Sequence, residues 1–536
     1  MGVPDAKQLA SERLCRATLL LAVLATFFTS AKGQFLSWDD MRFLVNDPDI
    51  AHPSAKALIS FFSGPRHEAF HPLHLLSYWL DAPWFGVDPV AMHVTNIVLW
   101  VVAGQLLWSA LVAWGLKPWP ATLAALLVLL HPVQVEAVSW VTGRKDCLAM
   151  LFVALAMLVA AREQGTRWTT ASAVAAALSK TSTLPLAPWL VLWRVLVCKD
   201  QLKATLFRYA LPLASAAVLA TVVFGIWRGE EMIRQTTLPA FALVAATYSH
   251  YLRTALFPSD LSPVYPLLEP DEWHAWYALG PAALTVAMIV VGRRSRVGAA
   301  VIIGFSLWLL PVSNIVPLRF QWADRYLSIP LIPLAMGAGW LVQRCAATRP
   351  RWLPWVVGAS ISIVAALGYT TYRYQLPWRS NLTLWLHATA AQPHAHYAWM
   401  KLGETLRDEG RYQEALEAYE RGRLERPGDA ALLTATFLSA VSADLNEYGE
   451  RSLSLAMNFH RHIHDSVGLR TLASELVSAD LRRAAKMALD RAFQLTPPSK
   501  HQLMRAADIQ EANGNGWLAT YYRDAAKRLL LNRSSR

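Results

Sequence analysis

The sequence carries little charge for its length. Of its 536 residues only 16% are charged, whereas 54% are hydrophobic. Soluble domains usually contain about 25% charged residues, so this scarcity excludes an ordinary soluble chain. The net charge of +12 could suggest nucleic acid as a partner, but the basic residues flank apolar blocks and form no long stripe. They are typical of the cytoplasmic ends of membrane helices, and we expect no nucleic acid partner.

Cysteine is scarce, and two common nucleotide-binding motifs are missing. There is neither a P-loop nor a glycine-rich dinucleotide fingerprint, which argues against a nucleotide-driven transporter. The spacing of the cysteines predicts neither a disulfide framework nor a zinc site. The four cysteines are Cys15, Cys147, Cys198 and Cys345.

Long apolar blocks of membrane-spanning length are what the sequence has in abundance. The first follows basic residues and lacks a good cleavage site, which predicts an uncleaved signal anchor. We therefore expect an all-α, polytopic membrane domain over residues 1–378, with residues 32–90 as its first outer-face loop. About eleven spanning helices are predicted, at 17–31, 91–113, 121–138, 146–162, 168–182, 184–198, 208–227, 276–292, 298–317, 326–343 and 352–372.

One further apolar block, residues 238–257, is ambiguous because it contains Tyr248, His250 and Arg253, which are costly in lipid. If this block spans the membrane, the basic clusters near residues 293 and 350 fall on the outer side. If it does not span, both clusters fall inside. The positive-inside rule favours the second reading and places everything after about residue 373 on the outer face.

The polar remainder of the chain repeats. Large, small and proline residues occupy the packing positions of a 34-residue tetratricopeptide repeat between 396 and 429. Later copies are degenerate, so we expect three or four repeats over residues 396–536, stacked as an α-solenoid after a linker at 379–395. The residues that fit the repeat are Trp399, Leu402, Gly403, Tyr412, Ala415, Tyr419, Pro427, Ala485, Leu489, Ala492 and Pro497.

Asp39 and Asp40 stand where the first apolar block has just ended. A carboxylate at the mouth of a membrane cavity can act as a general base on an acceptor hydroxyl. Two adjacent aspartates can equally form an ordinary solvated turn. The residues alone leave both readings open.

Three other polar stretches also lie at predicted outer helix ends. Residues 131–146 combine His, Glu, Arg, Lys and Asp, which suits a phosphate or sugar but also a mixed-charge loop. Lys180 could hold a lipid phosphate as a point charge or simply snorkel to the interface. Arg325 could contact phosphate oxygens bidentately with Asp324 orienting it, or the two could form a local pair.

Three histidines, His67, His71 and His74, lie close together in the first outer loop. No carboxylate or cysteine completes a convincing ligand set around them. We therefore predict no metal site there.

These stretches occur in an order that resembles the transmembrane and tetratricopeptide-repeat O-mannosyltransferases that modify cadherins, and more closely their bacterial relatives of the GT-C class. The sequence departs from the animal pattern at His71, which stands in place of an arginine, and at Thr181, which follows Lys180 in place of a glutamate. The resemblance rests on Trp38-Asp39-Asp40, Met92-His93-Val-Thr-Asn96, His131-Pro132, Glu136-Ala-Val138, Gly143-Arg-Lys-Asp146, Ser179-Lys180 and Asp324-Arg325-Tyr326.

The resemblance implies a GT-C fold and inverting transfer of a sugar from a polyprenyl-phosphate donor held at the outer face of the membrane. It implies no certain cofactor and leaves a divalent cation open. Asp39 would be the base, with Asp40 as the alternative. The donor phosphate would be bound by Arg325, Lys180 and Arg144, and the pocket would be lined by His131, Glu136, Asp146, Asp324, Tyr326 and His93.

A solenoid on the same face as this site favours a protein acceptor, with Trp399 and Tyr412 as contacts. Two alternatives stay open: an acceptor that is a glycolipid or surface polysaccharide, and a non-enzymatic membrane scaffold that presents the repeats. The closer bacterial resemblance implies a bacterial inner membrane with periplasmic repeats, or the endoplasmic reticulum with lumenal repeats in a eukaryote.

Overall fold

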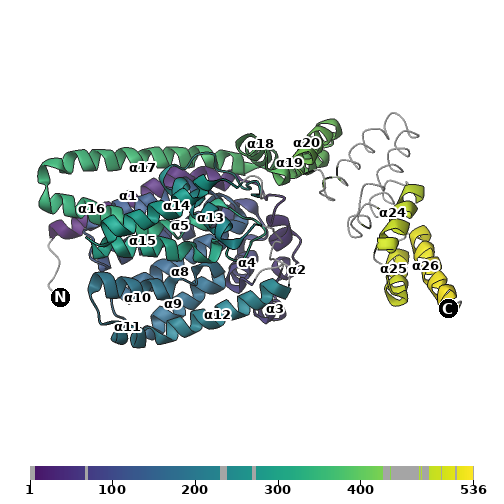
Figure 1. Ribbon diagram of the computed structural model, residues 1–536, viewed down its shortest axis with the longest axis horizontal. Helices are drawn as coiled ribbons and strands as arrows, with labels where there is room; N and C mark the ends of the chain where they lie inside the picture. The colour runs from purple at the N-terminus through teal and green to yellow at the C-terminus, as the bar shows by residue number, and fades with distance from the viewer. Residues whose placement is uncertain are drawn as a thin grey trace. The chain divides into compact units, whose positions relative to one another are not determined.

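The regular elements of the described chain are all helical, as predicted (Figure 1). The chain divides into two compact units, Met1–Gln392 and Pro393–Arg536. The computed structural model describes residues 6–66, 70–229, 238–268, 273–426, 482–495, 498–512 and 516–534, with isolated positions at 432, 435, 470 and 473.

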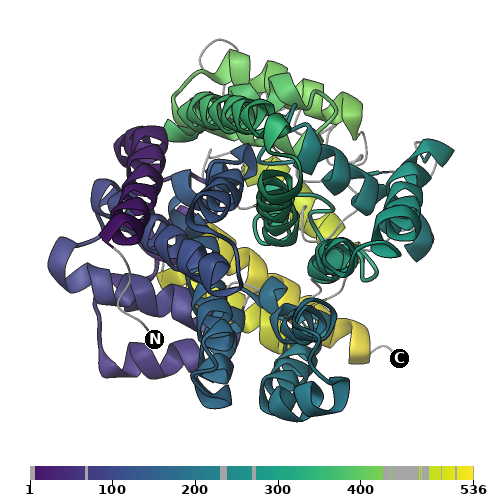
Figure 2. The ribbon, with the colours of Figure 1, turned by 90° about the vertical axis from the view of Figure 1, so that its left-hand side faces the viewer.

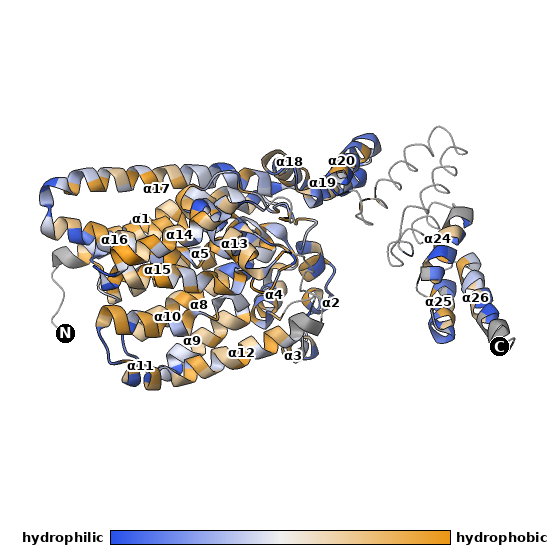
Figure 3. Cartoon of the chain, viewed as in Figure 1, coloured by the Kyte–Doolittle hydropathy of each residue, from blue (hydrophilic) through white to orange (hydrophobic). Residues whose placement is uncertain are grey.

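The first unit is a bundle of long helices that lie side by side (Figures 1 and 2). At its centre α5 packs against α1, α6 and α8, while α8 also packs against α9. Figure 3 shows that the helices of the bundle are largely hydrophobic. Its main helices are α1 (Ala6–Phe27), α5 (Pro89–Ala113), α6 (Pro118–Leu129), α8 (Arg144–Ala161), α9 (Thr166–Ser179), α10 (Leu186–Trp193), α12 (Ala210–Gly229), α13 (Ala240–Leu256), α14 (Leu279–Ala287), α15 (Arg296–Leu309), α16 (Leu331–Thr348) and α17 (Leu353–Gln375).

Some of the predicted spans form helices that are long and apolar enough to cross a membrane. Within the part of the chain that the structure describes, five are long and apolar enough, or seven if two bent helix pairs each count as one span. The other predicted spans stay predictions; among them α9 and α15 have only 14 residues and α8 begins with three charged residues. The protein is a multi-pass integral membrane protein. The candidates are Leu9–Lys32, Pro89–Ala113, Thr181–Cys198, Ala275–Gly292 and Pro350–Arg379, and the bent pairs are Pro118–Leu129 with Pro132–Ser139 and Leu202–Arg208 with Ala210–Gly225.

The ambiguous block forms α13, which is not among these candidates. Its tyrosines bond to the protein: the Tyr248 hydroxyl donates to the Ser306 carbonyl at 2.7 Å, and the Tyr251 hydroxyl bonds both the N–H and the carbonyl of Ala323. These polar groups are thereby satisfied away from lipid. Whether residues 238–257 span the membrane stays a prediction.

The segment expected as the first outer-face loop folds into short helices: α2 (Pro48–Ala51), α3 (Ala55–Ser63) and α4 (Pro72–Phe85). The Ser54 side chain caps α3 by accepting from the Ala57 N–H at 3.1 Å. The helices enclose a small apolar core. Its buried members include Phe43, Leu44, Ile50, Phe61, Leu75, Tyr78 and Met92.

The range 379–395, expected as a linker, is mostly helix. Here α18 (Asn381–Ala391) begins after Ser380, whose hydroxyl accepts from the Thr383 N–H at 3.3 Å. It buries Leu384 and Trp385 within the first unit. A segment with buried aromatic and aliphatic side chains is part of the packed unit, not a flexible connection.

The second unit begins with a helical hairpin of α19 (His396–Asp408) and α20 (Tyr412–Glu425). Gly403 lies against the ring of Tyr419 and leaves no room for a side chain there. Further on, α24 (Arg482–Leu495), α25 (Lys500–Ala512) and α26 (Gly516–Ser534) follow. The degenerate copy at about 430–465, apart from residues 432 and 435, lies outside the described residues, as do Pro427 and Pro497. The repeat solenoid therefore stays a prediction.

Candidate active site

The two adjacent aspartates have opposite environments. Asp40 is fully buried, where its carboxylate accepts from the N–H groups of Leu36 and Thr142 at 2.9 Å each and from the Thr142 hydroxyl. Burial raises its pKa to about 6 despite these bonds. The Asp39 side chain is instead 28% exposed. Of the pair, Asp39 is free to meet a substrate, whereas Asp40 ties its loop to residue 142.

Lys145 pairs with Asp39. Its Nζ lies 3.9 Å from the Asp39 carboxylate and 4.9 Å from the ring centre of Trp140. It stands in the first turn of α8, and its side chain is 12% exposed. The sequence analysis gave this place to Arg144 and missed Lys145. Adjacent helical residues point about 100° apart, so only one of the two can face Asp39.

Arg144 faces the other way and is wholly buried. Its guanidinium donates to Asn96 at 2.9 Å, to Asp81 at 2.6 Å and to the Met92 carbonyl at 3.0 Å, and it lies over the Tyr78 ring. Every nitrogen is engaged. These contacts clamp α4, α5 and α8 together and leave nothing for a donor phosphate, so the predicted phosphate role of Arg144 does not fit its position.

Two buried ion pairs lie behind Asp39 and Lys145. Arg325 donates from its N–H at 2.9 Å and from its guanidinium to Glu136. Lys180 pairs with Asp146 and also donates to the Arg325 carbonyl at 3.2 Å. The structure thus brings three of the predicted stretches together. Charges that are held away from water in this way interact strongly with each other and with any charged group nearby, because the local dielectric constant is low.

Asp324 does not orient Arg325, contrary to the expectation from sequence. Its two oxygens accept from the hydroxyls of Tyr265 at 2.5 Å and Tyr374 at 2.8 Å. Burial, with the nearby charge of Glu136, raises the pKa of Asp324 to about 8, against these two hydrogen bonds. Glu136 is the residue that orients Arg325.

Aromatic rings enclose the charged groups. Trp38 stacks on Trp140 with ring centres 5.0 Å apart, and Trp385 of α18 lies 5.6 Å from Trp38. The Arg325 guanidinium lies 5.2 Å from the Tyr326 ring centre, over its face. Faces of aromatic rings attract cations, so these rings help to hold the buried charges.

The histidines of the site have different roles. His131 caps its own turn, because its Nδ1 accepts from the Val133 N–H at 3.4 Å. His93 is buried beside Gly33, where an added Cβ would lie 2.6 Å from its Nε2. Burial and the charges of Lys145 and Lys180 lower the pKa of His71 to about 3. The His71 imidazole is therefore neutral near the two lysines.

The donor set does not fit a divalent cation. In residues that the structure describes, no group of three or more His, Cys, Asp or Glu side chains is placed to hold a metal ion. Asp39 faces a lysine, and the oxygens of Asp40 are occupied. His67 lies outside the described residues.

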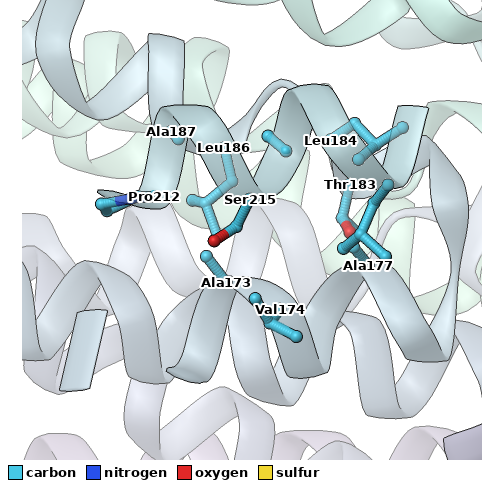
Figure 4. A pocket seen from close by; sticks show the side chains of 11 residues that line it. Ala173, Val174, Ala177, Thr183, Leu184, Leu186, Ala187, Pro212 and Ser215 are labelled. Atoms are coloured by element: carbon cyan, nitrogen blue, oxygen red, sulfur yellow. The ribbon is translucent and has the colours of Figure 1, made fainter. Parts of the chain in front are cut away.

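A small apolar pocket lies between α9, α10 and α12 (Figure 4). Its volume is about 10 Å³, which is room for about one water molecule. It adjoins the turn of Lys180, whose carbonyl accepts from the Thr183 hydroxyl at 2.9 Å. The pocket carries no charged group and is too small for a sugar.

The two predicted acceptor contacts lie in the second unit. The Trp399 indole donates to the Pro393 carbonyl at 2.7 Å, and its Cβ lies against Gly422. Tyr412 begins α20. Trp399 thus packs within its own hairpin, and an acceptor role for either residue stays a prediction.

The chain's sequence relatives are protein O-mannosyl-transferases by name. No family model matches the chain. Protein O-mannosyl-transferase TMTC3 of Mus musculus is 23% identical over 480 residues, covering 77% of this chain and 51% of the relative. Protein O-mannosyl-transferase F38B6.6 of Caenorhabditis elegans is 23% identical over 455 residues, covering 76% and 62%.

The chain is a distant homologue of these O-mannosyl-transferases. It spans about half the length of the TMTC3 relatives that it matches. Among solved structures, ArnT from Cupriavidus metallidurans bound to undecaprenyl phosphate aligns with a TM-score of 0.40 at 16% identity, covering 83% of this chain and 80% of that chain.

Proposed function

We propose that the protein is a GT-C glycosyltransferase that moves a monosaccharide from a polyprenyl-phosphate donor to an acceptor hydroxyl at the outer membrane face. One observation carries the proposal: a partly exposed carboxylate, Asp39, lies 3.9 Å from a lysine at the edge of a buried cluster of cations. A base beside cations is what transfer from a sugar phosphate requires. The distant homology to O-mannosyl-transferases agrees with it.

The chemistry follows from the charges. Asp39 takes the proton of the acceptor hydroxyl, and that oxygen attacks the anomeric carbon. The bond from this carbon to the phosphate oxygen breaks, and the electron pair leaves with the polyprenyl phosphate. The phosphate gains one negative charge, which Lys145 stabilises from the front and Arg325 and Lys180 from behind. Attack opposite the leaving group inverts the anomeric carbon.

Lys145 is better suited to meet the donor than the two cations predicted from sequence. Arg325 and Lys180 are committed to Glu136 and Asp146 in tight pairs, whereas the pair between Lys145 and Asp39 is loose at 3.9 Å. A phosphate can draw Lys145 away, which leaves the carboxylate to accept a proton.

A protein hydroxyl is the proposed acceptor. Two features support it: the names of the distant relatives, and the helical hairpin α19–α20, whose glycine and tyrosine contact has the spacing of a tetratricopeptide repeat. Such repeats usually form a surface for peptides.

The test uses the full-length protein in lipid nanodiscs with undecaprenyl phosphate mannose carrying a radiolabelled sugar. The acceptor is the membrane and surface protein fraction from cells that lack this chain. We expect label in protein bands and release of undecaprenyl phosphate in equal amount.

Label that enters lipid or polysaccharide and not protein would contradict the protein acceptor. Failure with this donor and with the corresponding glucose and galactose donors would contradict the proposed activity and favour a scaffold.

A further inference from the structure

The loop that carries Asp39 is held by a distant segment. Three backbone N–H groups between residues 34 and 37 donate to acceptors outside the local backbone. The Gln34 N–H donates to the Arg379 carbonyl at 2.9 Å, and the Ser37 N–H donates to the Asn381 side-chain oxygen at 2.6 Å. The third, from Leu36, goes to Asp40.

Ring packing reinforces the same attachment. Trp38, next to Asp39, lies 5.6 Å from Trp385, which is fully buried one turn after Asn381 on α18. Just before the loop, the Ser30 hydroxyl donates to Gln375 at 2.7 Å. The segment from 375 to 385 therefore runs beside the loop from 30 to 40 and contacts it at several points.

We propose that Asn381 is a positioning residue for Asp39, and that α18 is a wall of the active site. The proposal rests on the function proposed above. The Asn381 side-chain oxygen accepts from the Ser37 amide, two residues before the base. Without that bond the peptide groups before Asp39 lose their fixed direction. A base displaced by about 1 Å can cost on the order of 100-fold in rate.

A second reading of Asn381 must be separated from this one. Asn381, Leu382 and Thr383 form an Asn-X-Thr sequence, the acceptor pattern for N-linked glycans. The Thr383 hydroxyl donates to the carbonyls of Pro377 and Ser380 and does not contact the Asp39 loop. Substitutions at 381 and at 383 both destroy the Asn-X-Thr pattern, but only a substitution at 381 can remove the hydrogen bond to Ser37.

Three variants of the full-length protein make the test. Asn381→Leu removes both the oxygen and the glycan pattern. Asn381→Asp removes the pattern but keeps an oxygen that can accept from Ser37. Thr383→Val removes the pattern, together with the hydroxyl's bonds to Pro377 and Ser380, but leaves the Asn381 oxygen in place, and it serves as the control.

We expect kcat for mannose transfer from undecaprenyl phosphate mannose to fall about 10- to 100-fold in Asn381→Leu. The KM for this donor should stay within about twofold, because the phosphate contacts are untouched. Asn381→Asp and Thr383→Val should retain most of the activity. Equal loss in all three variants, or no loss in Asn381→Leu beyond that of Thr383→Val, would overturn the proposal.

Hydrogen exchange, measured by mass spectrometry on the peptide that contains Ser37, tests the positioning role of Asn381 independently of sugar transfer. Exchange in this peptide should quicken about tenfold or more in Asn381→Leu and stay unchanged in the other two variants, because an amide exchanges when its hydrogen bond opens. If the wild type transfers no sugar, the proposed function fails while exchange still tests the positioning. Unchanged exchange in Asn381→Leu would overturn the positioning itself.

Discussion

At the residue scale, neighbouring side chains of one motif take different tasks. Asp39 and Lys145 face each other at the open edge of the site, while Asp40 and Arg144 turn inward and hold loops and helices. The sequence alone does not show which residue of each adjacent pair is buried. Burial decides the role, because a buried charge is stable only when hydrogen-bond partners or opposite charges satisfy it.

Lys145→Gln tests which cation meets the donor. We expect binding of undecaprenyl phosphate to weaken about 10- to 100-fold, the effect of losing one charge-assisted hydrogen bond of about 1.5–3 kcal/mol. Microscale thermophoresis on protein in nanodiscs measures it. Lys56→Gln, at an exposed position on α3, is the matched control and should bind as the wild type does. Equal binding by both variants would exclude Lys145 from the phosphate site.

Asp324 gives a prediction for pH. Its pKa is raised to about 8 in the folded protein from an ordinary value of 3.8, so the folded state binds the extra proton between these values. Its contribution to stability is complete below about pH 4 and is lost as the pH rises through 8. Asn mimics the neutral acid and does not titrate.

Asp324→Asn should therefore gain stability relative to the wild type as the pH rises. We expect the stability difference to grow by up to about 4 kcal/mol between pH 5 and pH 8, at about 1.36 kcal/mol for each pH unit, and the difference in Tm to widen with it. Thermal unfolding in nanodiscs at several pH values provides the measurement. Parallel curves for the two proteins would show that Asp324 is ionised in the fold.

At the element scale, the limits of sequence reasoning are clearest at α18. Residues 379–395 lie between a membrane helix and polar repeats, and their composition fits a linker. The structure shows Leu384 and Trp385 buried in the membrane unit. The burial could not be foreseen, because the surface that covers Trp385 includes Trp38, far away in sequence.

Other elements were predictable because their signals are local. Long apolar blocks predicted most of the helical bundle, and the polar residues after the first block placed Asp39 just beyond the end of a membrane helix. Up to seven of the predicted spans are long and apolar enough to cross a membrane in the described residues, and the others stay predictions. The pairing of Glu136 with Arg325, 189 residues apart, also has no local signal.

The native cysteines test the topology of α13. Cys198 is exposed and Cys345 is partly exposed, whereas Cys15 and Cys147 are buried. If residues 238–257 do not span the membrane, Cys198 and Cys345 both lie inside. Single-cysteine variants in bacterial cells should then react with an impermeant maleimide only after the membranes are inverted. Labelling of Cys345 but not Cys198 on intact cells would show that the block spans.

At the scale of the whole molecule, the two units divide the proposed work. The first contains Asp39, the cations and α18, so it should bind the donor alone. The second would supply the acceptor surface. The boundary at Gln392 differs from the boundary at 378 expected from sequence, and the difference includes Asn381 and Trp385.

Two truncations exploit that difference. A chain ending at Gln392 should keep the Tm of the membrane unit and bind undecaprenyl phosphate within about twofold of the full chain, but should transfer little sugar to protein. A chain ending at Trp378 loses α18 and should show faster hydrogen exchange around Ser37. Identical exchange in the two truncations would mean that α18 does not support the Asp39 loop.

The central claim is that Asp39 is the base of a sugar transfer, and its most direct test is kcat for Asp39→Asn with undecaprenyl phosphate mannose. The substitution keeps the shape of the side chain and removes its ability to take a proton. We expect kcat to fall about 10²- to 10⁴-fold while binding of undecaprenyl phosphate stays within about twofold of the wild type. If the variant keeps more than about a tenth of the wild-type kcat, the claim is contradicted, because a general base contributes a factor of about 10² to 10⁴.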